Sequence, residues 1–101
     1  MERRSEDALS EFRIFETDEF LKRLNKLATR DAAFLRRKLD SYVYPQLKVE
    51  PFWGNNIKKL QGYTPETWRY RIGKFRVFYI VDNDEQILYI LTVDDRKDAY
   101  R

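Results

Sequence analysis

The sequence predicts an α+β fold, with an N-terminal strand and a helical hairpin packed on a small, mainly antiparallel sheet. Two observations carry this prediction. Apolar residues repeat at helical spacing between residues 20 and 43, and three strand-like segments joined by short turns lie between residues 68 and 93. A chain of 101 residues accommodates one domain. We expect that domain to span residues 11–101, and we expect the polar, aperiodic residues 1–10 to form a flexible N-terminal extension.

The first half of the chain carries the predicted helices. Residues 12–15 are mostly apolar and suit a short first strand, and Thr17 or Asp18 can cap the helix that follows. A second helix is expected to begin between Thr29 and Asp31 and to end at Pro45, because proline lacks a backbone N–H. The apolar stripes are Phe20, Leu21, Leu24 and Leu27 in the first helix and Leu35, Leu39, Tyr42 and Val43 in the second. Two short, adjacent, amphipathic helices are expected to pack as a hairpin on the sheet.

The second half predicts the sheet. Residues 51–65 have turn chemistry, with glycine, asparagine and proline. In residues 68–72 apolar and basic residues alternate, which is typical of a strand. Residues 75–81 are apolar except for Arg76, so a central strand covered on both faces is expected, and residues 87–93 form the last apolar segment. The short connections predict an antiparallel meander.

The basic residues of this meander are expected to share one face. Successive strand residues point to opposite sides, so Arg69 and Arg71 lie together when their apolar neighbours face the helices. If Arg76 shares that face, three guanidiniums meet on two paired strands, and Arg96 and Tyr100 could close the rim. Two interpretations remain open at this point. Guanidiniums match phosphate oxygens, which suggests an anion site. Alternatively, this is an ordinary solvated face whose arginines pair with acids, namely Glu66, Asp94, Asp95 and Asp98.

Composition excludes several kinds of chemistry. The chain has no cysteine and no histidine, so thiolate or histidine metal sites and a Ser-His-Asp triad cannot form. The adjacent acids Asp94 and Asp95 alone are a poor metal site. Twenty basic and 17 acidic residues give a net charge of only +3, which does not by itself indicate a nucleic-acid binder. No apolar run approaches the roughly 18 residues of a membrane span, so we expect a soluble, cytoplasmic protein.

Three motifs in this order resemble a known family. They are the Lys-Leu-x-Gly loop in residues 57–62, the Trp-Arg-Tyr-Arg-Ile-Gly-Lys-Phe-Arg run from residue 68, and the Arg-x-x-x-Tyr tail in residues 92–101. Together with the helical hairpin they resemble the RelE/ParE superfamily of type II toxin–antitoxin toxins, on the side of the RelE-like mRNA interferases. The resemblance implies a RelE-like toxin domain that cleaves mRNA in the ribosomal A site. It implies attack by the RNA 2′-hydroxyl on the phosphodiester, no metal or cofactor, and a cognate antitoxin protein as partner.

The resemblance also implies roles for individual residues. Arg69 and Arg71 occupy the two basic positions of one strand, and Arg76 matches the arginine that holds the scissile phosphate. Arg96 matches a basic residue suited to stabilising charge in the transition state, and Tyr100 matches a tyrosine that stacks on a base or orients the 2′-hydroxyl. Further substrate contacts are expected from three lysines, Lys58, Lys59 and Lys74.

The general base is the point at which this chain departs from the family pattern. Related toxins carry lysines at the positions of Arg69 and Arg71, and arginine scarcely deprotonates near neutral pH. Either Asp95 or another carboxylate takes the proton, or catalysis rests on orientation and charge stabilisation, which is the interpretation that we favour. Two alternative functions share the fold: a ParE-like inhibitor of DNA gyrase, and a catalytically silent domain that binds only antitoxin or RNA.

Overall fold

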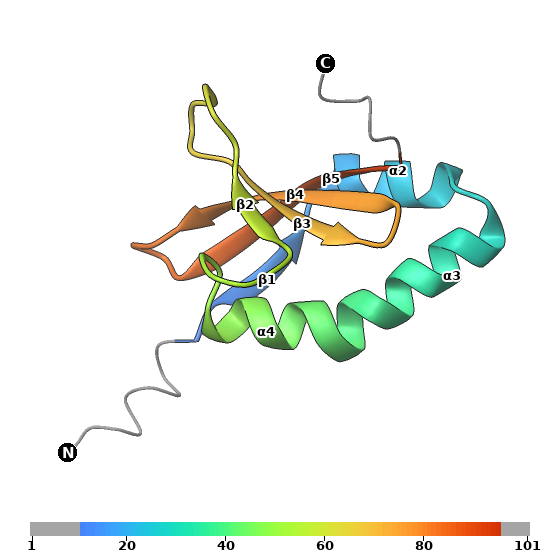
Figure 1. Ribbon diagram of the computed structural model, residues 1–101, viewed down its shortest axis with the longest axis horizontal. Coiled ribbons are helices and arrows are strands. Elements are labelled where there is room, and N and C mark those ends of the chain that lie inside the picture. The colour runs from blue at the N-terminus through green and yellow to red at the C-terminus, as the bar shows by residue number, and fades with distance from the viewer. Residues whose placement is uncertain (1–10, 96–101) are drawn as a thin grey trace.

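The predicted fold class is confirmed. The computed structural model describes residues 11–95, in which one sheet carries a long helical run along one face (Figure 1). The strand order is β1-β5-β4-β3-β2, with β1 parallel to β5 and every other neighbouring pair antiparallel. The elements are β1 (Arg13–Glu16), α2 (Asp18–Lys26), α3 (Thr29–Lys38), η1 (Leu39–Val43), α4 (Tyr44–Val49), β2 (Ile57–Lys59), β3 (Trp68–Ile72), β4 (Phe75–Asp82) and β5 (Ile87–Asp94). The predicted N-terminal extension lies outside the described residues.

Thr17 begins α2 and also joins that helix to the sheet. Its hydroxyl oxygen accepts a hydrogen bond from the Phe20 N–H at 3.2 Å, so Thr17 is the cap, one of the two residues predicted for it. The same hydroxyl donates to the carbonyl of Ile90 in β5 at 2.8 Å. Phe20 and Leu24 are buried, whereas Leu21, which the stripe included, is 38% exposed. One polar side chain therefore sets where the hairpin begins on the parallel β1–β5 pair.

The prediction that Pro45 ends the second helix was wrong. The helix continues through the π-helical turn η1 and then through α4 to Val49, with Pro45 in the first turn of α4. In the π turn the Tyr44 N–H donates to the Leu39 carbonyl, five residues earlier. Proline is tolerated in a first helical turn because its missing N–H has no intrahelical partner there. This change of hydrogen-bond register also leaves Tyr42, predicted on the apolar stripe, 55% exposed.

The core lies between the helices and one face of the sheet. Its largest fully buried side chains are Tyr70, Tyr79, Phe20, Phe75, Leu35, Leu39, Leu47, Leu88 and Ile90. Tyr70 and Tyr79 are buried with their hydroxyls satisfied, because Tyr70 donates to Gln46 Oε1 and Tyr79 donates to the Pro51 carbonyl, both at 2.6 Å. These bonds tie β3 and β4 to the end of the helical run.

A strand not expected from the sequence lies within the segment predicted as turns. Residues Ile57–Lys59 form β2, which pairs antiparallel with β3 at the edge of the sheet. The loop of residues 60–67 then rises on the side of the sheet away from α3 and α4 (Figure 1). Its base is closed by a hydrogen bond of 2.9 Å from the Leu60 N–H to the Thr67 carbonyl. Three residues are too few to show a period of two, so the pattern gave no sign of this strand.

Candidate functional site

The strand register brings the predicted arginines together on the face of the sheet opposite the core. Arg71 of β3 and Arg76 of β4 are direct cross-strand partners, and Arg69 lies two residues from Arg71 on the same strand. The intervening residues Tyr70 and Ile72 are buried in the core, so the arginines point to the other side, here called the open face. Arg71 is exposed, and Arg69 and Arg76 are half-buried. Arg69, Arg71 and Arg76 therefore share one face of two paired strands, as the sequence predicted.

Among the predicted lysine contacts, Lys58 joins this group. It is the cross-strand partner of Arg69 and shares the open face. Lys59 pairs with Trp68, so its side chain leaves from the other face, and its ammonium lies 2.8 Å from a carboxylate oxygen of Glu66. We use the name basic cluster for the four cations of the open face, Lys58, Arg69, Arg71 and Arg76.

Lys74 occupies the turn between β3 and β4. Its ammonium lies 3.7 Å from a carboxylate oxygen of Asp31 in α3, and 5.3 Å from the centre of the Phe75 ring. Both neighbours belong to the helix side of the sheet, so Lys74 is directed away from the basic cluster. The turn still contacts the basic cluster through its backbone, because the Lys74 carbonyl accepts a hydrogen bond of 3.1 Å from the Arg76 guanidinium.

A β-bulge places an acid beside the cluster. The ladder between β4 and β5 shifts by one residue at Phe78 and Tyr79, which pair with Thr92 and Ile90 and leave Leu91 unpaired. Beyond the bulge Asp94 is the cross-strand partner of Arg76. One row of the open face thus carries Arg71, Arg76 and Asp94 on three adjacent strands.

Asp94 was not a candidate site residue in the sequence. Counting residues along an unbroken hairpin would have put its neighbour opposite Arg76, and no feature of the sequence marks the bulge. Its carboxylate also lies 3.7 Å from the guanidinium of Arg23 in α2. The predicted candidate Asp95 is the last described residue and is exposed. Arg96 and Tyr100 lie outside the described residues.

A cavity of about 240 Å³ opens on the open face beside the basic cluster. Its walls come from the β2–β3 loop and from β4 and β5, and they are Leu60, Tyr63, Thr67, Phe78, Leu91, Thr92 and Asp94. Four of these side chains, Leu60, Tyr63, Phe78 and Leu91, are apolar or aromatic. Sequence reasoning missed it, because the loop that supplies Tyr63 has no periodic pattern.

Comparison with known proteins places the chain in a family. Residues 14–100 match the sequence model of the "ParE toxin of type II toxin-antitoxin system". The chain belongs to the RelE/ParE superfamily of toxins. A 46-residue segment, 46% of the toxin, is 46% identical to the predicted toxin RelE1 of Methanocaldococcus jannaschii. That alignment spans half of the relative's length.

Solved structures agree with this assignment at the level of the fold. The RelBE2 toxin–antitoxin complex of Mycobacterium tuberculosis matches with a TM-score of 0.67 and 26% identity, covering 85% of the toxin and 99% of that chain. The RelE–RelB complex of Pyrococcus horikoshii matches with a TM-score of 0.60 and 24% identity. The match covers 88% of the toxin and 99% of that chain. An Escherichia coli RelE mutant in the free state matches with a TM-score of 0.64 and 17% identity. The match covers 89% of the toxin and 88% of that chain.

Two features do not occur in the part of the toxin that the structure describes, a cluster of metal ligands and a membrane-spanning helix. No three acidic side chains in residues 11–95 are grouped so that they could hold a metal ion. The described helices also include none that is long and apolar enough to cross a membrane.

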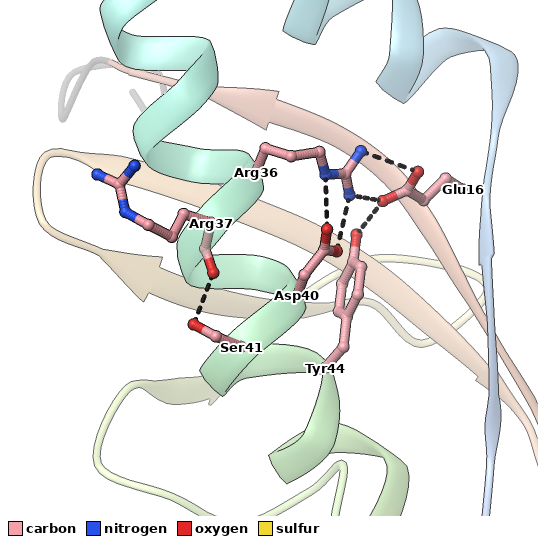
Figure 2. Close-up of polar contacts among 6 residues, drawn as sticks. All are labelled: Glu16, Arg36, Arg37, Asp40, Ser41 and Tyr44. Carbon is pink, nitrogen blue, oxygen red and sulfur yellow. Dashed lines mark hydrogen bonds and ion pairs between the residues drawn. The ribbon is translucent and has the colours of Figure 1, made fainter.

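A second polar cluster of the toxin, at the edge of β1, has a structural role. The Tyr44 hydroxyl donates to Glu16 Oε2 at 2.6 Å, and Arg36 binds both Glu16 and Asp40 (Figure 2). Burial, and then the hydrogen bond to Glu16, raise the pKa of Tyr44, so the phenol stays neutral. The bond with Glu16 raises the pKa of Arg36. These groups hold β1 against the helical run, and neither the phenol nor the guanidinium is available as a base near neutral pH.

Proposed function

We propose that this toxin is a ribosome-dependent mRNA endoribonuclease. The observation that carries the proposal is the direct pairing of Arg71 with Arg76, with Arg69 and Lys58 in the adjacent row. Like charges placed opposite one another on a sheet are destabilising, while the carboxylate of Asp94 lies on the β5 side of Arg76. A phosphodiester bound between them would offset the repulsion, since guanidinium forks donate in pairs to phosphate oxygens.

The chemistry that this arrangement supports is transesterification within the RNA. The 2′-hydroxyl oxygen forms a bond to the adjacent phosphorus, the bond from phosphorus to the 5′-oxygen breaks, and the 2′-hydroxyl loses its proton while the leaving oxygen gains one. The products are a cyclic phosphate and a 5′-hydroxyl end. Arg76 and its neighbours would hold the phosphate in line and neutralise the charge that grows on its oxygens. Arg96 and Tyr100 would act on the leaving oxygen and on a base, as their family positions imply.

The proton acceptor is the least constrained part of this mechanism. The chain has no histidine, and its arginines stay protonated near neutral pH. Asp94 faces Arg76 and Asp95 follows it, so a carboxylate is near the cluster. We propose that orientation and charge stabilisation provide most of the rate enhancement.

The partners follow from the family. Neighbouring folds were solved as complexes of a RelE toxin with a RelB antitoxin, and a cognate antitoxin is expected for this toxin too. We propose mRNA in the ribosomal A site as the substrate, which places the action in the cytoplasm. No small-molecule cofactor or metal is needed for the proposed step.

One observation favours a second candidate function. The matching family model is that of the ParE toxin, and a ParE-like toxin would inhibit DNA gyrase without cutting RNA. The basic cluster argues for the nuclease, because a gyrase inhibitor does not need cations gathered around a phosphate. The two candidates predict different nucleic-acid lesions in the cell.

Mapping RNA ends after induction, with and without active translation, tests the proposal. We expect new 5′-hydroxyl ends within translated mRNA, lost when translation is blocked and lost in Arg76→Ala. The matched control is Arg30→Ala, which removes an exposed arginine of α3 on the helix side and should cut like the wild type. Intact mRNA at good soluble expression contradicts the nuclease, and DNA breaks with intact mRNA favour the gyrase inhibitor.

A further inference from the structure

Two aromatic side chains line the cavity on the open face, and one of them comes from a loop that is held at its base. Phe78 of β4 forms part of its floor, and Tyr63 stands at the edge of the cavity from the β2–β3 loop, with 58% of its surface exposed. The loop is held at its base, because Lys59 pairs with Glu66 at 2.8 Å and the Thr67 hydroxyl donates to the Pro65 carbonyl at 2.9 Å. Tyr63 is therefore presented to the cavity by an anchored loop.

The strand register places the cavity next to the basic cluster. Phe78 is the cross-strand partner of Arg69 and lies two residues beyond Arg76 on the same face. Neighbouring strands lie about 4.8 Å apart, and alternate residues of one strand lie about 7 Å apart. An RNA strand whose phosphate rests on Arg76 and Arg69 would therefore bring an adjacent base within reach of Phe78.

The remaining walls can recognise the edge of a base. The Thr92 hydroxyl is buried and makes no hydrogen bond within residues 11–95, so its donor and acceptor capacity is unused there. Asp94 adds a carboxylate that accepts hydrogen bonds from amino or imino groups. Aromatic and apolar walls with a few polar groups at the edge are what an unstacked RNA base requires.

We propose that this cavity seats the nucleobase next to the scissile phosphate and sets the base preference of cleavage, with Tyr63 stacking on that base. The proposal rests on the nuclease function proposed above. The cations next to Phe78 in the strand register favour a nucleotide as occupant, because Arg69 and Arg76 complement the phosphate to which the base is attached. An apolar side chain of the antitoxin is the competing occupant.

The test compares Tyr63→Ala with Tyr63→Phe, which keeps the ring. The matched control is Tyr42→Ala, because Tyr42 is similarly exposed, at 55%, but belongs to η1 on the helix side. Single-turnover cleavage is measured on ribosomes carrying mRNAs with each of the four bases on either side of the cut. Antitoxin affinity is measured for the same variants, and thermal melting shows that each variant is folded.

The proposal expects Tyr63→Ala to slow cleavage of the preferred mRNA roughly 5- to 150-fold and to reduce the difference among the four bases. Tyr63→Phe, which keeps the stacking ring, should restore most of the rate lost in Tyr63→Ala. Tyr42→Ala should cut like the wild type, and antitoxin affinity should be unchanged in all three variants. Unchanged cleavage by Tyr63→Ala overturns the proposal, and so does uniform slowing with the same base preference. Loss of antitoxin affinity with normal cleavage assigns the cavity to the antitoxin. If the wild type itself cuts no mRNA, the nuclease function fails and this inference fails with it.

Discussion

Arg71 and Arg76 lie directly opposite one another on β3 and β4, and both project from the open face of the sheet. Opposed like charges lower the stability of a strand pair. A pair kept for binding a phosphate should therefore show a trade-off, in which removing one charge helps folding and harms function. An ordinary solvated face would show no such trade-off.

Arg71→Thr tests the trade-off directly. Threonine suits a strand, so the substitution removes repulsion without disturbing the backbone. We expect the free energy of unfolding to rise by about 0.2–1 kcal/mol, measured by denaturant titration, together with slower single-turnover cleavage.

The matched control for Arg71→Thr is Arg13→Thr. Arg13 is an exposed strand arginine opposite Ile87, so no like charge is relieved when it is replaced. This control should gain no stability from relief of repulsion and should keep normal cleavage. A fall in stability of Arg71→Thr with normal cleavage would show that the arginine supports the fold and not the substrate.

Arg76→Ala should have the largest effect on the reaction. Arg76 is the partner of both Arg71 and Asp94, and its guanidinium is oriented by the Lys74 carbonyl. Removing one preorganised donor to a developing negative charge slows catalysis roughly 10²- to 10³-fold. Single-turnover cleavage on programmed ribosomes measures this effect. A loss of rate below about tenfold would show that Arg76 is not the main group that stabilises the developing charge.

Asp95→Asn distinguishes a carboxylate base from catalysis by charge and orientation. A general base contributes roughly 10²- to 10⁴-fold to the rate. We expect Asp95→Asn to lose less than that range and far less than Arg76→Ala. Asp84→Asn, in the exposed turn between β4 and β5, is the matched control. Equal losses in Asp95→Asn and Arg76→Ala would identify Asp95 as the proton acceptor.

Tyr44→Phe tests the polar cluster that holds β1 to the helical run. The substitution keeps the ring and removes the hydroxyl that donates to Glu16. A loss of about 1 kcal/mol in the free energy of unfolding is expected, because a half-buried carboxylate oxygen loses a donor. Tyr42→Phe, two residues earlier and exposed, should change stability by less than about 0.5 kcal/mol. Equal effects of the two substitutions would mean that the hydrogen bond from Tyr44 to Glu16 does not stabilise the fold.

Alkaline pH should unfold the toxin through its buried tyrosines. Burial is the main cause that raises the pKa of Tyr44, Tyr70 and Tyr79 above the ordinary value of 10.0. A raised pKa in the folded state means that stability is complete below about pH 10 and falls as pH rises above it. Phenolate absorbance should show these three tyrosines titrating together with unfolding. Ionisation of the three near pH 10 in a protein that stays folded would contradict this.

The local sequence pattern determined several features of the fold and of the candidate site. Alternation along residues 68–72 put Arg69 and Arg71 on one face, since the side-chain period of a strand leaves no other choice once Tyr70 and Ile72 are buried. Thr17 marked the start of α2 because capping depends on neighbouring residues alone. The absence of histidine already removed imidazole chemistry from consideration.

The tertiary structure decided what depends on residues far apart in the chain. The bulge at Leu91 moved Asp94 opposite Arg76, and a one-residue shift of register reverses which side chains share a face. The π turn carried the helix past Pro45, because a change of hydrogen-bond register made the missing N–H harmless. Tyr63 reaches the cavity beside Phe78 from a loop whose two ends are joined by the hydrogen bond between Leu60 and Thr67. These placements follow from pairing and packing between distant segments, which local sequence does not encode.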